Sequence, residues 1–338
     1  IHDSTPNAGS MSAMRLTSGV LLVCALVALP HSGPMAAGAE AQRTRAPFVL
    51  EDATIASVHA AFAARTLTCR ALVDQYLARI SAYDQAGPAL NAIVVVNPDA
   101  RAAADALDAR YRQRGPVGPL HCVPAIVKDN FETIGLQSAD GSLALKGFVS
   151  ERDAFLVQRI KAAGAIVLAK SNMAEFAFSP LETVNSLAGT TKNPYALDRV
   201  PAGSSGGTAA AVAANFGLIG LGSDTGNSIR GPSSHNALVG VRSTMGLTSR
   251  AGVIPLSYLA DIAGPMTRTV ADAAAVFQVI VGEDPDDAMT ARSRGRATPR
   301  YADALKADGL AGARVGVLHQ AFERANLPVD PDIAAIFA

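Results

Sequence analysis

Two short segments rich in glycine and serine contain the residues of this sequence that are best suited to chemistry. The first, residues 203–207 (Gly-Ser-Ser-Gly-Gly), precedes a helix-like run of alanine and valine. The second, residues 222–228, follows a short apolar segment and ends at Ser228. A serine hydroxyl can attack a carbonyl carbon once a neighbouring base takes its proton, and N–H groups at a helix N-terminus can bind an anion.

The first segment has two non-catalytic interpretations. Its backbone N–H groups could cradle a phosphate, but residues 203–207 lack the Gly-Lys-Ser/Thr ending of a P-loop and the glycine spacing of a dinucleotide site. Composition alone therefore favours a purely structural turn.

Residues 203–207 also match the Gly-x-Ser-x-Gly pattern of a nucleophile elbow, in which Ser205 would attack and His121 or His235 would be the base. Such an elbow must follow a buried strand. Residues 193–201 contain two prolines, an aspartate and an arginine, which is not the composition of a buried strand. The pattern therefore disfavours a Ser–His hydrolase.

The elements that would position these segments alternate between helices and apolar strands. Apolar residues at helical spacing predict two helices within 54–82, with Thr68 as the N-cap of the second. This alternation predicts a layered α/β fold with a largely buried sheet. The other expected elements are helices at 98–113 and 153–163 and strands at 91–96, 123–127, 165–169, 218–221 and 314–318.

Length, composition and charge exclude several classes of protein. The chain has 338 residues, of which 49% are hydrophobic and 17% are charged. This hydrophobicity excludes a disordered chain. The 29 basic residues balance 29 acidic ones, so there is no basic excess that would indicate nucleic-acid binding. Three cysteines are too few for a disulfide-dense scaffold.

The first part of the chain has the pattern of a targeting segment. An apolar run over 19–30 is too short to span a bilayer, and Ala-Gly-Ala at 37–39 fits a cleavage site. We therefore expect residues 1–39 to be an upstream remnant and a secretory signal peptide, and residues 40–338 to be the mature domain. The alternative is the hydrophobic start of a buried helix.

Export would place the protein in the periplasm or outside the cell, without stable membrane insertion after cleavage. Cys69 and Cys122 would then be the remaining cysteines. An oxidising compartment would permit a bond between them, but the sequence leaves their separation in space open. A lone cysteine between apolar residues usually packs in the core, so Cys122 is disfavoured as a nucleophile.

Several motifs occur in order between residues 54 and 282, and together they resemble the amidase signature family. One motif alone would be a weak signal, whereas the ordered set is specific. The motifs are GPLHCVPAIVKDN (118–130), LAKSNMAEFAF (168–178), PAGSSGGTAAAVAA (201–214), GLGSDTGNSIRGPSS (220–234) and GLTSRAGVIPLSYLADIAGPMTRTVADA (246–273).

The resemblance implies a Ser-cisSer-Lys catalytic triad. Ser228 falls on the nucleophile position, Ser204 on the bridging serine that follows a cis peptide bond, and Lys128 on the base. A lysine can take a proton only when it is neutral, and burial is what lowers its pKa far enough. The apolar neighbours Ile126 and Val127 are compatible with burial.

The resemblance also implies a mixed, mostly parallel sheet covered by helices on both faces, and a reaction without metal ion or cofactor. An oxyanion hole would be formed by the backbone N–H groups of Thr225, Gly226, Asn227 and Ser228. We further expect substrate contacts from the side chains of Ser138, Met173 and Thr208.

Three positions depart from the family pattern. Asn227 stands where a second glycine is common, Cys122 stands where glycine is usual, and Arg-Ser-Thr at 242–244 replaces Lys-Pro-Thr. Asparagine tolerates a left-handed backbone, so the loop can form, but its side chain could narrow the pocket. We interpret Asp224 and Arg230, which flank the nucleophile, as residues that orient the loop.

The function implied is hydrolysis of a small carboxylic amide to an acid and ammonia or an amine. Two alternatives are an amidotransferase subunit that supplies ammonia for aminoacyl-tRNA and a non-catalytic protein on the same fold. A homodimer is compatible with the sequence. Family members usually continue beyond residue 338, so we expect the C-terminal part of the fold to be missing and apolar surface to be exposed there.

Overall fold

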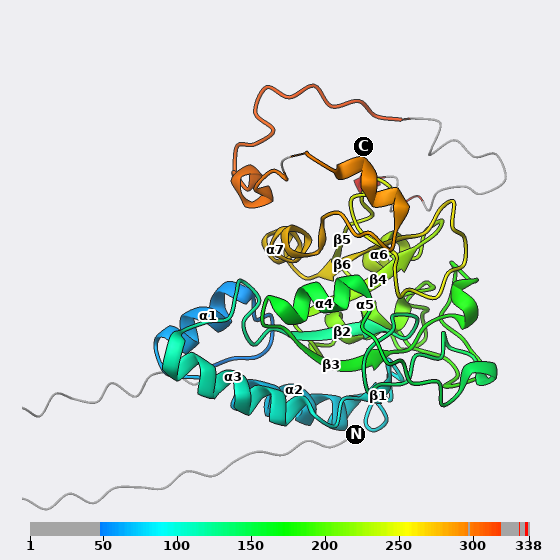
Figure 1. Cartoon of the computed structure of the whole chain (residues 1–338). Coiled ribbons are helices and arrows are strands. Elements are labelled where there is room, and N and C mark those ends of the chain that lie inside the picture. Colours follow the sequence, from blue (N-terminus) through cyan, green and yellow to red (C-terminus); the bar gives the residue numbers. More distant parts are fainter. Residues whose placement is uncertain (1–47, 297, 319–330, 332–334, 337–338) are drawn as a thin grey trace, which may run out of the picture. The chain divides into compact units, whose positions relative to one another are not determined.

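The computed structural model describes residues 48–296, 298–318, 331 and 335–336 (Figure 1). These residues belong to the larger of two compact units, which spans residues 45–338. The predicted signal peptide at 1–39 lies outside the described residues. Within the described part of the chain, no helix is long and apolar enough to cross a membrane.

The described residues form one six-stranded sheet in the order β1-β3-β2-β4-β6-β5. The α/β architecture expected from the sequence is therefore confirmed, but the sheet is less parallel than expected. Only the β3–β2 and β2–β4 pairings are parallel, and the other three are antiparallel. The strands are β1 (Ile93–Val96), β2 (Pro124–Lys128), β3 (Ile166–Ser171), β4 (Ile219–Asp224), β5 (Val239–Gly240) and β6 (Ile262–Thr267).

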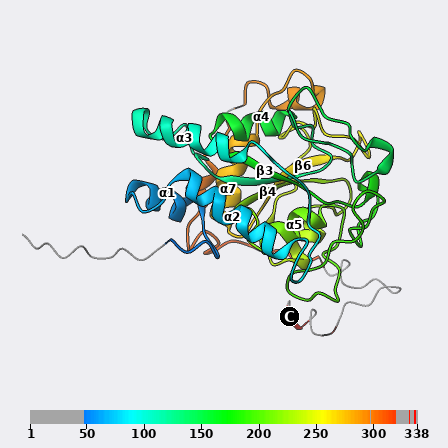
Figure 2. The same cartoon turned by 90° about the horizontal axis from the view of Figure 1, so that it is seen from below.

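Helices cover both faces of this sheet. Figure 2 shows α4 and α5 on opposite sides of the strands, and α7 packs against α4. The pair α2 and α3 lies beside β3. The α-helices are α1 (Ile55–Ala63), α2 (Cys69–Tyr83), α3 (Ala100–Arg114), α4 (Phe155–Ala162), α5 (Gly206–Ala213), α6 (Arg230–His235) and α7 (Val270–Ile280). Short 3₁₀ turns are η1 (Leu143–Leu145), η2 (Glu175–Ala177), η3 (Ala288–Ser293) and η4 (Tyr301–Ala304).

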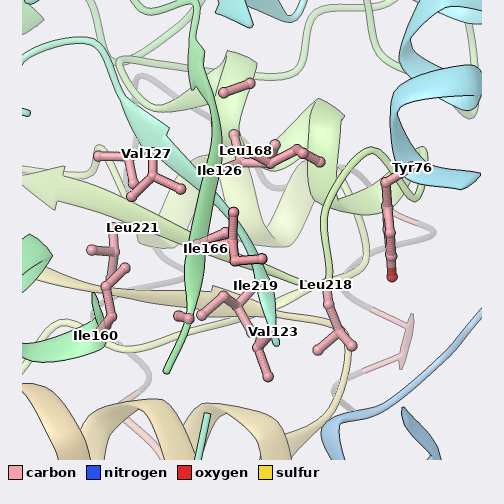
Figure 3. Packing of buried hydrophobic residues seen from close by; sticks show 14 of the residues in the cluster. Tyr76, Val123, Ile126, Val127, Ile160, Ile166, Leu168, Leu218, Ile219 and Leu221 are labelled. Atoms are coloured by element: carbon pink, nitrogen blue, oxygen red, sulfur yellow. The ribbon is translucent and has the colours of Figure 1, made fainter. Parts of the chain in front are cut away.

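The core lies where the central strands meet the helices (Figure 3). Every residue of β2, β3 and β4 is buried, as expected of strands covered on both faces. Ile126, Ile160 and Leu168 are among the largest fully buried side chains.

Small residues bring α5 unusually close to the sheet. All of Gly206–Val212 is buried. A Cβ atom at Gly207 would lie 2.7 Å from the carbonyl carbon of Asn172, and one at Gly220 would lie 2.6 Å from Thr208 Cγ2. Glycine is therefore required at both positions by close backbone approach.

Local sequence signals predicted the ends of several helices and strands correctly. The Thr68 side chain accepts a hydrogen bond from Ala71 N and caps α2, as predicted. The expected strand at 314–318 does not form, and no described segment pairs with it. Val315 and Val317 are 76% and 61% exposed. Alternating apolar residues make a strand only where a partner supplies hydrogen bonds.

A disulfide joins Cys69, the first residue of α2, to Cys122, which lies two residues before β2. The two Cα atoms are 5.6 Å apart, which is an ordinary separation for a bridged pair. Cys122 has a φ of +63°, in the left-handed region that glycine adopts most readily. This conformation explains why a glycine is usual at the position. The cysteine that replaces it has an unfavourable backbone conformation but gains the disulfide.

We predict that the double variant Cys69→Ser/Cys122→Ser is less stable than the oxidised protein by about 2–4 kcal/mol, because the cross-link closes a long loop of the unfolded chain. Cys69→Ser/Cys122→Gly is expected to recover about 1 kcal/mol of this loss, because glycine adopts the left-handed backbone without a Cβ clash. Urea unfolding followed by circular dichroism measures both free energies. Equal stabilities of the two double variants would contradict the role of backbone conformation.

Candidate active site

The end of the central strand β2 places Lys128 between β3 and β4, in a fully buried position. Its Nζ atom donates a hydrogen bond to Ser204 Oγ at 2.7 Å and another to Ser223 Oγ at 2.8 Å. These two close partners are hydroxyl groups, which can donate as well as accept, and a longer hydrogen bond of 3.5 Å runs from Nζ to the backbone carbonyl of Ser223. The site can therefore hold Lys128 either as an ammonium or as a neutral amine.

Burial lowers the pKa of Lys128 to about 7, although the negative charges of Asp140, Asp224 and Asp261 act in the opposite direction. Near neutral pH a substantial fraction of this side chain is consequently a neutral amine with a free lone pair. Such an amine can take a proton from the adjacent hydroxyl.

Ser204 is held by the loop that opens α5. The Gly203–Ser204 peptide bond is cis, as the resemblance implied. A Cβ atom at residue 203 would lie 2.5 Å from Ser179 O, so only glycine fits beneath the neighbouring backbone. The Ser204 carbonyl accepts a hydrogen bond from Ala174 N at 3.0 Å. These contacts hold the Ser204 hydroxyl against Lys128.

Ser228 lies in the loop between β4 and α6 and is 4% exposed. Its carbonyl accepts a hydrogen bond from Ser205 N at 3.3 Å, which ties the loop to the segment carrying Ser204. The Ser228 hydroxyl forms no hydrogen bond with any residue that the structure describes. It is thus available to an incoming carbonyl group.

The backbone around Ser228 has the donors that an oxyanion would need. The N–H groups of Gly226, Asn227 and Ser228 donate to no acceptor in the described part of the chain. The N–H group of Thr225, the fourth predicted donor, likewise has no acceptor among the described residues, and the Thr225 side chain is held separately, since its Oγ1 donates to Asp261 Oδ1 at 2.5 Å. Unpaired N–H groups next to a nucleophile are suited to stabilise a tetrahedral oxyanion.

The carboxylate of Asp224 organises this loop. It accepts hydrogen bonds from Ile229 N at 3.0 Å, from Arg230 Nε at 3.1 Å and from Arg242 Nη1 at 3.0 Å. Burial alone would raise the pKa of Asp224, but the hydrogen bonds from Arg230 and the backbone lower it below its usual value. Asp224 and Arg230 are therefore orienting residues, as the sequence suggested, and Arg242 joins them.

Asn227 adopts an ordinary backbone conformation and does not need the left-handed region that we considered for it. Its side-chain amide lies over Gly231, in the space that a Cβ atom there would fill. Gly231 therefore accommodates the asparagine that replaces the more common glycine.

The substrate contacts expected of Ser138, Met173 and Thr208 stay predictions. Ser138, Met173 and Thr208 are all fully buried. The Ser138 hydroxyl donates to Phe131 O at 3.0 Å. The Thr208 hydroxyl shares a hydrogen bond with that of Ser171 at 2.7 Å. Two of the three side chains are thus hydrogen-bonded within the protein.

Two residues near Lys128, Ser223 and Asn130, were missed by the sequence reasoning, and a third, Asp140, acts on the charge of Lys128. Ser223 binds Lys128, and Asn130 Nδ2 donates to the same Ser223 hydroxyl at 3.0 Å. Asp140 is 1% exposed, and its Oδ1 atom is buried without a hydrogen-bond partner. The strand register, which pairs Val127 with Leu221, would have indicated Ser223, but it cannot be read from sequence.

The rival nucleophiles are not supported by the geometry. The Ser205 hydroxyl donates to Ser223 O at 3.1 Å and contacts neither histidine. His121 is buried and stacks on Tyr111, with ring centroids 5.2 Å apart. Cys122 is in the disulfide. Among the described residues, no group of three or more His, Cys, Asp or Glu side chains could hold a metal ion.

Comparisons with known proteins identify the family of the chain. The family model described as Amidase matches residues 71–337, so the chain belongs to the amidase family. Peptide amidase from Stenotrophomonas maltophilia has a similar structure, with a TM-score of 0.76 and 42% identity over 79% of this chain and 55% of that chain.

Two curated relatives bear different names. A protein named as a probable amidase from Arabidopsis thaliana is 37% identical over 302 residues, which cover 87% of this chain and 58% of the relative. A glutamyl-tRNA(Gln) amidotransferase subunit from Acidothermus cellulolyticus is 41% identical over 268 residues, covering 79% of this chain and 52% of the relative. The chain thus spans about half the length of the curated relatives it matches.

We predict that labelling of Ser228 by a fluorophosphonate accelerates as the pH rises through about 7, because only the neutral form of Lys128 accepts a proton. Asp140→Asn removes a carboxyl group whose charge, when ionised, raises the pKa of Lys128. Burial raises the pKa of Asp140 itself to about 7, so the two groups titrate together in the unaltered protein. The acidic limb of the labelling profile should therefore move about 1 pH unit lower.

The matched control is Asp272→Asn, a substitution of a buried aspartate in the first turn of α7, whose Oδ1 accepts a hydrogen bond from Ile55 N at the start of α1 and which is not among the charges that act on Lys128. Its acidic limb should coincide with that of the unmodified protein. If the acidic limb of the labelling profile lies at the same pH in Asp140→Asn as in the unaltered protein, Asp140 does not act on the pKa of Lys128.

Proposed function

We propose that this protein hydrolyses a carboxylic amide to an acid and ammonia or an amine, through an acyl-enzyme on Ser228. The observation that carries the proposal is the buried Lys128 amine, with a pKa lowered to about 7 and 2.7 Å from the Ser204 hydroxyl. Membership of the amidase family and the similarity to peptide amidase support the same reaction.

In the proposed reaction, Lys128 takes the proton of Ser204 while Ser204 takes that of Ser228. Ser228 Oγ then forms a bond to the carbonyl carbon, and the N–H groups of 226–228 stabilise the oxyanion. The proton returns through Ser204 to the amide nitrogen as the C–N bond breaks. Water, deprotonated along the same path, releases the acid and restores Ser228.

The rim of the site favours amides with apolar substituents. The loop 174–184 packs on the Ser204 segment, since Gly203 N donates to Pro180 O at 3.0 Å. The loop 254–261 packs on the other side through Asn130, whose Nδ2 donates to Ile254 O at 3.4 Å. The large apolar side chains exposed on these two loops are Phe176, Phe178, Leu181, Val184, Leu256, Tyr258 and Leu259.

A second candidate is the ammonia-supplying component of a tRNA-dependent amidotransferase, which the relative from Acidothermus cellulolyticus favours. It would require glutamine as the amide and partner proteins. The apolar rim favours the hydrolase instead, because free glutamine is polar. The homodimer compatible with the sequence stays a prediction.

The decisive experiment labels the folded protein with a fluorophosphonate, followed by intact mass and peptide mapping. We expect one adduct on Ser228, and none in Ser228→Ala or Lys128→Met. A panel of aliphatic, aryl and peptide amides, with glutamine included, should show faster hydrolysis of the apolar members. A folded sample without adduct on Ser228 would refute the hydrolase, and glutamine as the preferred amide would support the second candidate.

We also propose that the protein is exported to an oxidising compartment. The apolar run over 19–30, with Ala-Gly-Ala at 37–39, supports export, and so does the Cys69–Cys122 disulfide, because such bonds persist mainly outside the cytoplasm. Expression in a bacterial host with residues 11–338 should yield a periplasmic product that begins at Glu40. Substituting Leu21 and Leu22 by arginine should retain it, uncleaved, in the cytoplasm. An unprocessed product from the unaltered sequence would contradict the proposal.

A further inference from the structure

A second fully buried lysine, Lys170, lies near the end of β3, beside Lys128. In the parallel pairing of β2 and β3, Lys170 is opposite Val127, whereas Lys128 is opposite Ser171. Because successive side chains of a strand point to opposite faces, the two lysines leave the sheet on different sides. The proposed mechanism uses only Lys128, which leaves a buried cation without an assigned role.

The partners of Lys170 differ in kind from those of Lys128. Its Nζ atom donates to the backbone carbonyls of Asp129 at 3.2 Å, Phe131 at 2.6 Å and Gln137 at 3.2 Å, and to Ser138 Oγ at 2.9 Å. Three of these four partners are carbonyl oxygens, which only accept. They favour the ammonium form and fix its three hydrogens in direction.

The groups that Lys170 binds belong to the segment immediately after Lys128, residues 129–138. This segment carries Asn130, whose Nδ2 donates to the Ser223 hydroxyl that Lys128 also binds. The adjoining turn, residues 139–141, is held against the same segment, because Asp129 Oδ2 accepts hydrogen bonds from Ala139 N at 3.1 Å and Gly141 N at 3.0 Å.

The charge of Lys170 is balanced locally. Burial lowers the pKa of Lys170 to about 8, and the nearby carboxylates of Asp129 and Glu132 act in the opposite direction. Burial raises the pKa of Asp129, and the charge of Lys170 is the first influence that counteracts this. Lys170 and Asp129 therefore stabilise each other's charge without a direct ion pair in the described structure.

We propose that Lys170 is a positioning residue for the active site, whose ammonium fixes the carbonyl groups of 129–138 and thereby holds Lys128 and Asn130 against Ser223. This inference rests on the proposed function for its effect on rate, but the fixing of the segment can be measured without any activity. Lys170 does not act as a second base, because three of its four partners are carbonyl oxygens, which have no proton to give it.

The test compares Lys170→Met, which has no donor, with Ile160→Ala, a cavity variant on the buried face of α4. In Lys170→Met the maximal rate of fluorophosphonate labelling at Ser228 should fall about 100-fold, with the half-saturating concentration within about 3-fold. Ile160→Ala, compared at a matched lowering of the melting temperature, should label at the original rate. Original labelling by Lys170→Met, or an equal loss in Ile160→Ala, would overturn the proposal.

Hydrogen exchange provides the readout that is independent of activity. The amides of 129–141 should exchange faster in Lys170→Met, while those of α7 should not change. Unchanged exchange over 129–141 would overturn the inference even in a protein that labels well, whereas absence of labelling in the unaltered protein refutes only the proposed function. If Lys170→Met does not fold, Lys170→Gln is used in the same two measurements. The glutamine side chain is shorter than that of lysine, so its amide reaches fewer of the carbonyl groups.

Discussion

The hydrogen bond from Lys128 Nζ to Ser204 Oγ joins residues 76 positions apart in the chain and lies in a fully buried place. An isolated ammonium is costly to bury, so the site depends on hydroxyl partners that serve the amine in both protonation states. The elements around this hydrogen bond bring the lysine and its hydroxyl partners together. The central strand brings the lysine inside, the glycine-rich loop brings the serine beneath it, and Ser223 supplies the second partner.

The two buried lysines show how partners decide what a cation does. The two shortest hydrogen bonds of Lys128 go to hydroxyl groups, with which it can exchange protons, whereas three of the four partners of Lys170 are carbonyl oxygens, which hold its protons in place. Burial lowers the pKa of both side chains, so burial alone does not distinguish a base from a positioning residue. The distinction follows from the atoms within hydrogen-bond reach.

The sequence predicted the helices and most strands well, because their signals are local. Thr68 caps α2, and the apolar run before Lys128 is a buried strand, as expected. It also indicated that Lys128 and Ser204 meet, because an ordered set of motifs carries long-range information. The substrate contacts of Ser138, Met173 and Thr208 stay predictions, since whether a buried side chain faces a pocket or the core depends on the tertiary fold. The strand predicted at 314–318 does not form, for a related reason. A strand must pair with a neighbouring strand, and composition does not reveal whether one is present.

Because α5 packs closely on the sheet, the amino-acid sequence can vary at some positions of the molecule and not at others. A single added methyl group at Gly207 or Gly220 would collide with backbone or buried atoms, so these positions tolerate little drift. The exposed side chains on loops 174–184 and 254–261 carry no such constraint. A directed-evolution library aimed at new amides would therefore be most productive on those two loops, with the small-residue helix left untouched.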